Sequence, residues 1–161
     1  AAAVGADSLG FGAAGGTSLN AAFSVSAPTA VVYDPVPSDC GTSNTLGCFI
    51  VSSSTTNTVH IIDPITGSQT VFRVGINPTA IAYNYLTSTL VSTNTLSHTI
   101  TVSDLLARRI RAVLTLPPAP VSLNLTSTGL PQFALDIHPL TNLAVIADTA
   151  NGRVLFVPIP R

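Results

Sequence analysis

The chain of 161 residues has little charge and lacks several residue types altogether. Only 8% of its residues are charged, every acidic residue is Asp, every basic residue is Arg, and Lys, Glu, Met and Trp are absent. A coiled coil or long helical bundle needs Glu, Lys and Leu on its faces, so this composition excludes that class. A net charge of −1 provides no basic field for binding nucleic acid. Ser, Thr, Asn or Pro interrupts every apolar run, so we expect no membrane-spanning helix.

Hydroxyl and aliphatic side chains dominate instead. The chain holds 16 Ser and 21 Thr, and 46% of its residues are hydrophobic. A near-neutral chain with this much apolar material is able to bury a core, which argues against intrinsic disorder. Residues 1–21 are rich in Ala and Gly and are expected to form a segment separate from residues 22–161.

The two cysteines lie close together in a polar loop. Cys40 and Cys48 are separated by Gly, Ser, Asn and Thr with a single Leu. This spacing predicts a disulfide that closes a short loop and indicates an oxidising compartment, with two free thiols as the alternative. A zinc site is disfavoured, because no second cysteine pair and no nearby His completes a ligand set.

The same order of short apolar segments occurs three times along the chain. Thr58–Asp63 matches Thr99–Asp104 at an offset of 41 residues. Pro28–Tyr33 matches Pro78–Tyr83 at an offset of 50, and the latter matches 132–137 at an offset of 54. The longer offsets place the additional residues in the cysteine loop and in a Pro-rich loop, where a folded repeat tolerates insertions. The chain is therefore predicted to consist of repeats.

Each repeat contains short β-rich segments separated by turn residues. Four strands in about 41 residues are typical of a β-propeller blade, so we expect an all-β fold of four-stranded antiparallel blades. The predicted blades span residues 28–75, 78–116 and 132–157. The third lacks a fourth strand of its own, and a segment such as 22–26 is predicted to complete it.

The order of these segments resembles the YVTN/NHL-type propeller repeats of secreted and cell-surface bacterial proteins. The resemblance rests on the segments Ile50–Ser53, Asn57–Val59, Ile61–Asp63 and Val74–Ala80. It implies a secreted, extracellular or cell-surface location, with the periplasm as an alternative. Such repeats support many functions, so the resemblance does not identify a ligand.

Three blades are fewer than the roughly four to eight that close a propeller ring. Two interpretations remain open. Two copies of the chain could pair head-to-tail into a six-bladed ring, or the chain could be part of a longer propeller. Either interpretation requires a partner, because isolated blades leave a strand edge and apolar faces exposed.

Signals for catalysis are few. His60, His98 and His138 occupy unrelated positions in the repeats, so they are not expected to form a ring of ligands. Asp63 and Asp104 occupy equivalent turn positions and are expected to accept backbone N–H bonds there. Propeller hydrolases that hold a channel calcium use a Glu ligand, which this chain lacks. No cofactor is therefore expected, with a calcium ion held by Asp and Asn as the alternative.

A binding surface, if present, is expected on the loops that join the second strand to the third and one blade to the next. These loops carry amide and hydroxyl groups suited to a neutral polar ligand such as a peptide or glycan. The candidate residues are Asn57, Asn77, Asn94, His98, Asp148 and Asn151. Asp136 is a further candidate on a predicted inner strand. The expected function is non-catalytic assembly or binding of protein or glycan, with a hydrolase or lyase using an Asp/Asn-held metal as the alternative.

Overall fold

The computed structural model describes residues 11–12, 18–19, 24–41, 46–117 and 133–161, and most of their regular structure is β-strand. Eleven strands form three antiparallel sheets of four, four and three strands. The prediction of an all-β fold is confirmed, and four-stranded antiparallel sheets are present in the first two repeats. In this part of the chain no helix is long and apolar enough to cross a membrane.

Each sheet is a meander in which consecutive strands pair with one another. The first sheet consists of β3 (Pro28–Asp34), β4 (Cys48–Ser53), β5 (Thr58–Ile62) and β6 (Gln69–Arg73). The second consists of β7 (Pro78–Asn84), β8 (Thr89–Asn94), β9 (Thr99–Asp104) and β10 (Arg109–Thr115). The third consists of β11 (Phe133–His138), β12 (Leu143–Asp148) and β13 (Arg153–Pro158).

Four short elements complete the described structure. Helix α1 (Pro37–Cys40) follows β3, and a 3-10 turn, η1 (Thr149–Asn151), follows β12. The N-terminal segment contains β1 (Phe11–Gly12) and β2 (Ser18–Leu19), a two-stranded sheet that we did not expect there.

The predicted fourth strand of the third sheet does not pair with that sheet in the described part of the chain. Residues 22–23 lie outside the described residues, and residues 24–26 are not in a strand. The third sheet is therefore three-stranded here, and β13 is its last strand.

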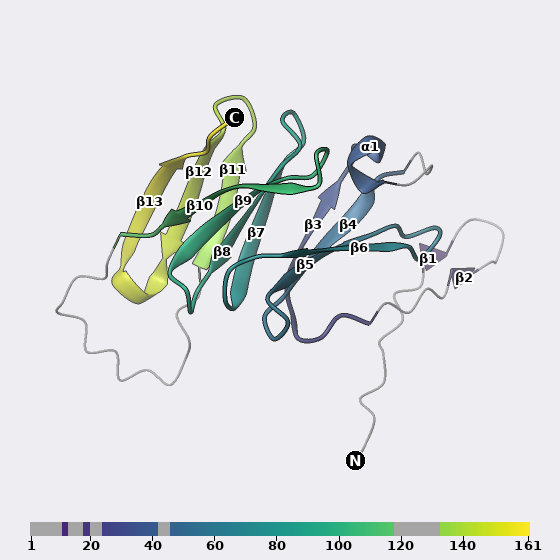
Figure 1. Ribbon diagram of the computed structural model, residues 1–161, viewed down its shortest axis with the longest axis horizontal. Helices are drawn as coiled ribbons and strands as arrows, with labels where there is room; N and C mark the ends of the chain where they lie inside the picture. The colour runs from purple at the N-terminus through teal and green to yellow at the C-terminus, as the bar shows by residue number, and fades with distance from the viewer. Residues whose placement is uncertain (1–10, 13–17, 20–23, 42–45, 118–132) are drawn as a thin grey trace, which may run out of the picture.

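The three sheets follow one another in chain order, with the second between the first and the third (Figure 1). Their first strands are neighbours, because β7 contacts both β3 and β11. This arrangement makes each sheet resemble a propeller blade, with its first strand innermost.

The three sheets also pair equivalent residues in the same register. In the second sheet, Ala82 lies opposite Val91, and Val91 opposite Val102. The offsets found in the sequence map this row onto a row of the first sheet and a row of the third. Those rows are Val32–Ile50–Ile61 and Asp136–Val145–Phe156. We call the face that carries these rows the forward face of each sheet and the opposite face the backward face.

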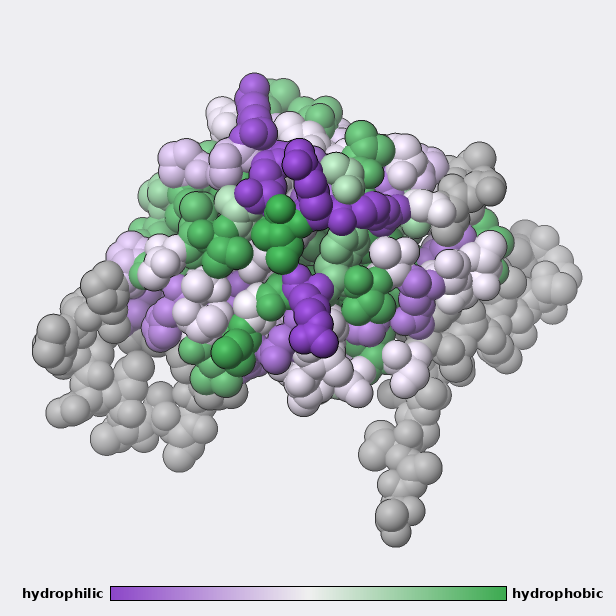
Figure 2. All heavy atoms as spheres, viewed as in Figure 1, coloured by the Kyte–Doolittle hydropathy of each residue, from purple (hydrophilic) through white to green (hydrophobic). Residues whose placement is uncertain are grey.

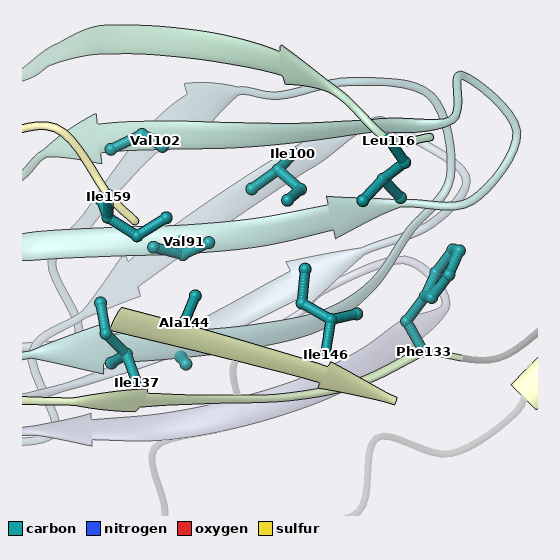
Figure 3. Close-up of a cluster of buried hydrophobic side chains, with 10 residues drawn as sticks. Val91, Ile100, Val102, Leu116, Phe133, Ile137, Ala144, Ile146 and Ile159 are labelled. Carbon is teal, nitrogen blue, oxygen red and sulfur yellow. The ribbon is translucent and has the colours of Figure 1, made fainter. Parts of the chain in front are cut away.

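Forward and backward faces meet to form two hydrophobic cores. The forward face of the first sheet packs on the second sheet through Ile50, Val59 and Ile61, which meet Ile81 and Leu90. The forward face of the second sheet packs on the third through Val91, Ile100 and Val102. They meet the backward-face residues Phe133, Ile137, Ala144 and Ile146, with Leu116 and Ile159 closing the cluster (Figure 3).

Buried Asp side chains fix two equivalent turns, as expected. Asp63 Oδ1 accepts backbone hydrogen bonds from Ile65 at 2.8 Å and from Thr66 at 3.3 Å. Asp104 Oδ1 accepts one from Ala107 at 2.9 Å, and its Oδ2 forms an ion pair with Arg111 at 2.6 Å. Burial opposes ionisation of Asp104, but the Ala107 amide and Arg111 together lower its pKa. Both aspartates therefore have structural roles.

The face of the molecule seen in Figure 2 shows hydrophobic residues in small patches separated by hydrophilic ones. This view looks across the edges of the three sheets rather than onto the outer faces of the first and third.

Candidate functional site

A cluster of buried titratable side chains lies where the first sheet meets the second. Asp34 ends β3, and both Asp34 and Asp39 are fully buried, with 0% of their surface exposed. Asp34 Oδ1 accepts a hydrogen bond from the Val36 backbone N–H at 2.8 Å, which forms a local turn. Pro37 then begins α1, because its fixed φ suits the first position of a helix. This short helix brings Asp39 next to Asp34.

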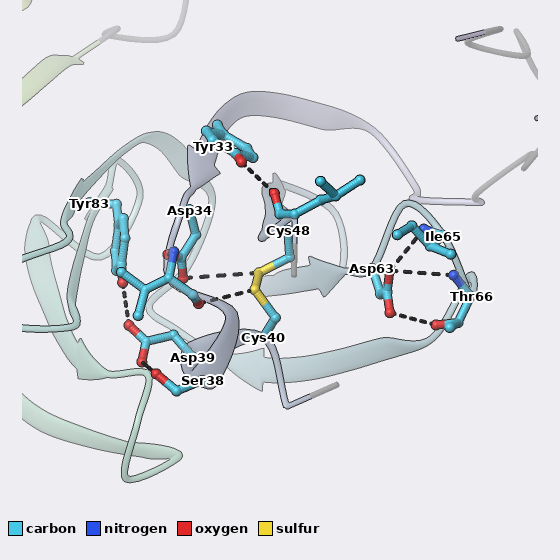
Figure 4. Close-up of a disulfide and its surroundings, with 12 residues drawn as sticks. Tyr33, Asp34, Ser38, Asp39, Cys40, Cys48, Asp63, Ile65, Thr66 and Tyr83 are labelled. Atoms are coloured by element: carbon cyan, nitrogen blue, oxygen red, sulfur yellow. Dashed lines mark hydrogen bonds between the residues drawn. A yellow bond between two sulfur atoms is a disulfide. The ribbon is translucent and has the colours of Figure 1, made fainter. Parts of the chain in front are cut away.

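Tyr83, from the second sheet, completes the cluster (Figure 4). Its hydroxyl donates a hydrogen bond to Asp39 Oδ2. The Ser38 hydroxyl donates to the other carboxylate oxygen of Asp39 at 3.3 Å. Because Tyr83 belongs to β7 and Asp39 to α1, this contact fastens the loop after β3 to the neighbouring sheet.

The electrostatics of the cluster follow from its burial. The pKa of Asp34 is raised from 3.8 to about 6, chiefly by burial and to a smaller extent by the neighbouring Asp39. The Val36 amide, the Tyr83 hydroxyl and Arg108 oppose this rise. Burial also raises the pKa of Tyr83, and its hydrogen bond to Asp39 acts in the same direction. Tyr83 therefore remains a hydrogen-bond donor at neutral pH.

The predicted disulfide between Cys40 and Cys48 is confirmed and lies beside this cluster (Figure 4). The two Cα atoms are 5.7 Å apart, within the usual range for a disulfide. Cys48 Sγ is 4.0 Å from Asp34 Oδ2, and Cys40 Sγ is 3.4 Å from the Val36 carbonyl oxygen. A disulfide sulfur carries no hydrogen, so these are close contacts rather than hydrogen bonds.

The same three residues bring together atoms that are common metal ligands. One carboxylate oxygen of Asp34 and the sulfurs of Cys40 and Cys48 lie within 4.8 Å of one another, and all three residues are buried. Cysteine binds a metal ion as a thiolate, however, and both sulfurs are already joined in the disulfide. The residues present therefore do not fit a metal ion while the disulfide is intact.

Two adjacent carboxyl groups could in principle share a proton and act as an acid and a base. A substrate would have to reach them, and neither Asp34 nor Asp39 exposes any surface. Their hydrogen bonds to Val36, Ser38 and Tyr83 hold the loop in place. The geometry supports a structural junction rather than a catalytic site.

The predicted binding-face residues Asn57, Asn77 and Asn94 lie in loops and a strand end near a further contact between the first and second sheets. Asn57 Oδ1 accepts a hydrogen bond from the Asn77 backbone N–H at 2.8 Å. The Asn77 carbonyl accepts one from Thr95 at 2.9 Å. Asn94 is fully buried and donates to the Thr101 hydroxyl at 2.9 Å. The Asn57 side chain and the Asn77 backbone therefore link the loops of the two sheets, whereas the Asn94 side chain bonds within the second sheet.

Asp148 and Asn151 lie in the turn between β12 and β13. Asp148 is 1% exposed, and its Oδ2 accepts hydrogen bonds from Asn151 Nδ2 at 2.7 Å and from Arg153 Nε at 2.8 Å. Arg153 also donates to the Pro117 carbonyl at 2.7 Å. Asp148 Oδ1 is buried and has no hydrogen-bond partner among the described residues. The ion pair with Arg153 opposes the binding of a cation at this position.

The histidines are far apart in the fold and have different surroundings. His98 is exposed in the β8–β9 turn, where its carbonyl accepts a hydrogen bond from Leu116 at 2.9 Å. His60 lies within β5 and contacts Thr58 and Gln69. His138 ends β11, and its Nδ1 accepts a hydrogen bond from the Thr141 backbone N–H at 3.3 Å.

Asp34, Asp39 and Tyr83 were missed by the sequence analysis. A usable signal was present, because the strand ends Asp34, Asn84 and His138 are equivalent by the same offsets. Asn84 is fully buried and donates from Nδ2 to Asn142 Oδ1 at 2.8 Å, which links the second sheet to the third. Equivalent positions thus mark both inter-sheet junctions.

Comparisons with known proteins provide information on the fold alone. No protein-family model matches the chain, and no curated protein sequence matches it. Among solved structures, the chain is similar to Kuenenia stuttgartiensis hydrazine synthase, with a TM-score of 0.53 and 16% sequence identity. The match covers 83% of this chain, which spans only 36% of that chain. At this identity the likeness says nothing about activity.

Proposed function

We propose that the chain is a non-catalytic β-propeller module, secreted or at the cell surface, whose function is assembly through the outer faces of its end sheets. One observation carries the proposal. Apolar residues of the second sheet that are buried against a neighbouring sheet have apolar equivalents on the outer faces of the first and third sheets, where they are exposed. Such a module would present its remaining loops for binding protein or glycan.

The forward face of the third sheet supports this proposal. Phe156 is 66% exposed, whereas the equivalent Val102 of the second sheet is 0% exposed. Val154 is 56% exposed, whereas the equivalent Ile100 is 1% exposed. These side chains occupy the positions that contact the next sheet elsewhere in the molecule. An exposed apolar face of this kind is typical of an interaction surface.

The backward face of the first sheet supports it in the same way. Val31 and Tyr33 are 62% and 52% exposed, whereas the equivalent Ile81 is 4% exposed against the first sheet. Val71 is also 52% exposed, and the Tyr33 ring lies 5.5 Å from the Phe49 ring on the same face. Both ends of the row of sheets therefore expose apolar residues whose counterparts are buried between sheets, beside polar residues such as Asp136 and Arg73.

Two further observations fit the proposal. The disulfide is compatible with an oxidising, extracellular compartment. Among the described residues the third sheet has three strands where the first two sheets have four, so a further strand would complete it. The YVTN/NHL resemblance points to the same class of secreted propeller repeats.

The alternative is an extracellular hydrolase or lyase with a metal held by Asp and Asn. The unpartnered Oδ1 atom of buried Asp148 favours it, and the ion pair of Asp148 with Arg153 disfavours it. Calcium analysis of the purified protein distinguishes the two functions. A stoichiometric calcium ion whose removal abolishes a hydrolytic activity would overturn the assembly proposal.

The test of assembly combines particle mass with binding of a hydrophobic dye. We expect the chain either to associate or, as a monomer, to bind an anilinonaphthalene sulfonate dye at its end faces. Replacing Phe156 and Val154 with Asp should abolish association or strongly reduce dye binding, and replacing Leu140 with Asp should do neither. Leu140 is a suitable control because it is 71% exposed in the β11–β12 turn, away from both faces. A monomer that binds no dye would show that the end faces are ordinary surface.

A further inference from the structure

We infer that the partner at these faces is a second copy of the same chain, with the forward face of one copy's third sheet packed on the backward face of the other copy's first sheet. This inference rests on the proposed function. It adds the identity of the partner and the polarity of the contact.

The polarity follows from the two contacts inside the chain. At both internal junctions a forward face meets a backward face, first sheet to second and second sheet to third. The end faces that remain are one forward face and one backward face, so a single chain carries both halves of one further contact. The pairing register is the same in all three sheets, so this contact would continue an interface that already occurs twice.

Specific residues would take over known positions. The forward row Asp136–Val145–Phe156 is equivalent to Ala82–Val91–Val102, which the third sheet covers. The backward-face residue Tyr33 is equivalent to Tyr83, which reaches across to the loop of the preceding sheet.

Charge also favours head-to-tail contact over contact between identical faces. Asp136 is exposed on the forward face of the third sheet, and Arg73 is exposed on the backward face of the first. Two forward faces would bring Asp136 toward its own copy, and two backward faces would do the same for Arg73. Like charges across an interface disfavour association. A head-to-tail contact pairs neither Asp136 nor Arg73 with its own copy, because the two residues lie on different faces.

The number of sheets predicts a closed particle. A head-to-tail contact forms a ring when its rotation closes and a filament when it does not. Two copies contribute six sheets, which lies within the roughly four to eight blades of known propellers. We therefore expect a dimer of twice the 16.4 kDa chain mass, in which both contacts are formed.

The decisive experiment uses one variant for each face of the full chain. Phe156→Glu disables the forward face and Val31→Glu disables the backward face. Sedimentation velocity should show a dimer for the unmodified chain. Each variant alone should be monomeric, with a dissociation constant raised at least about 30-fold, as for loss of a central apolar anchor.

Mixing the two variants provides the test of polarity. Each variant retains the face that the other has lost, so the mixture should form a one-to-one heterodimer through a single intact contact. Leu140→Glu serves as the control and should dimerise like the unmodified chain. Circular dichroism confirms that each variant is folded, and Val154→Glu and Val71→Glu serve as second variants for the two faces.

Three results would overturn the inference. A dimer formed by either variant alone would indicate contact between identical faces. A mixture that remains monomeric would exclude the head-to-tail contact. A monomeric unmodified chain whose end faces still bind the dye would overturn the second copy as partner, while the assembly proposal would remain, with sheets of a longer chain as the partner.

Discussion

The second sheet and the two sheets that flank it share one strand order and one pairing register, but they are buried differently. All six residues of β8, in the second sheet, are buried. Its counterpart in the third sheet, β12, alternates between buried and half-buried residues. The second sheet has a neighbour on each face, and each of the others has a neighbour on one face only. Burial here depends on neighbouring sheets, as in other repeat proteins.

Several positions on the end faces remain apolar despite this exposure, although Asp136 stands where the second sheet has Ala82. Val145 and Phe156 face outward in the third sheet, yet they are as apolar as their buried counterparts Val91 and Val102. In a sheet with one face in water, polar residues on that face alternate along each strand with apolar residues on the buried face. The comparison therefore supports the proposal that a further sheet covers these positions in an assembly.

The largest expected effect comes from making the same substitution at two equivalent valines, Val91 and Val145. Val91→Asp places a carboxylate between the second and third sheets and should destabilise the chain by about 4 kcal/mol or more, so that it does not fold. Val145→Asp makes the same change at the equivalent outward position and should leave the isolated chain folded. Urea unfolding followed by circular dichroism measures both.

Equal destabilisation by the two substitutions would contradict the distinction between middle and end sheets. Val91→Ala and Val145→Ala provide a milder pair if neither Asp variant is recovered. The expected losses are about 2 kcal/mol for Val91→Ala, from the methyl groups removed and the cavity left behind, and below about 1 kcal/mol for Val145→Ala.

The second prediction concerns the disulfide beside the contact between the first and second sheets. Replacing Cys40 and Cys48 with Ala removes the link across eight residues and should lower the free energy of unfolding by about 2–3 kcal/mol. The loss should be concentrated in the first sheet, because the disulfide holds the loop that contacts Tyr83. Hydrogen–deuterium exchange should therefore increase in β3 and β4 more than in β11 and β12. Uniform exchange across all three sheets would show that the junction does not act locally.

The third prediction is that the free energy of unfolding depends on pH through Asp34, at the contact between the first and second sheets. The pKa of Asp34 is raised to about 6 in the folded chain, so the unfolded chain loses this proton first as pH rises. The contribution of Asp34 to stability is therefore fully present below about pH 4 and is lost as pH rises to about 6. The expected loss is about 1–2 kcal/mol.

Asp34→Asn should remove this dependence and be more stable than the unmodified chain at pH 7. Asn84, at the equivalent position of the second junction, already carries an amide and serves as the natural control. Urea unfolding at pH 4, 5, 6 and 7 measures the effect. A stability that rises with pH over this range in the unmodified chain, and not in Asp34→Asn, would contradict the assignment.

The smallest expected effect concerns the surface of the middle sheet. Arg111 forms an ion pair with Asp104 at 2.6 Å, and its side chain is 20% exposed. Arg111→Gln should lower stability by about 0.5–1 kcal/mol, the usual range for such a pair, and less in high salt. Thermal unfolding at low and high salt measures this, and a loss above about 2 kcal/mol would show that the middle sheet depends on charge as well as packing.

Much of the strand arrangement could be predicted from the sequence, because the offsets of 41, 50 and 54 residues place turn residues and apolar segments in equivalent positions. Asp63 and Asp104 were correctly assigned to turns, since their bonds are made within three residues. The Asp39–Tyr83 contact could not be predicted in the same way. It joins residues 44 positions apart and depends on how two sheets pack.

The candidate binding residues illustrate the same limit. Asn57, Asn77 and Asn94 were expected to present amides to a ligand because they occupy loops. In the structure the Asn57 side chain accepts a hydrogen bond from the Asn77 backbone, and the Asn94 side chain donates one to the Thr101 hydroxyl. Loop position and residue type can be found in a sequence, but whether a polar group is used internally depends on the tertiary structure.

The strand ends Asp34, Asn84 and His138 have a consequence for how such a chain could evolve. One structural position carries an acid, an amide and an imidazole in turn, and the first two bind different partners in their neighbours. Exchanging the first and second sheets by recombination would place Asp34 against Asn142 and Asn84 against Tyr33, so neither strand end would keep its present partner. The sheets are alike in backbone but are not interchangeable. The side chains at their contacts therefore require the sheets to keep their order along the chain during evolution.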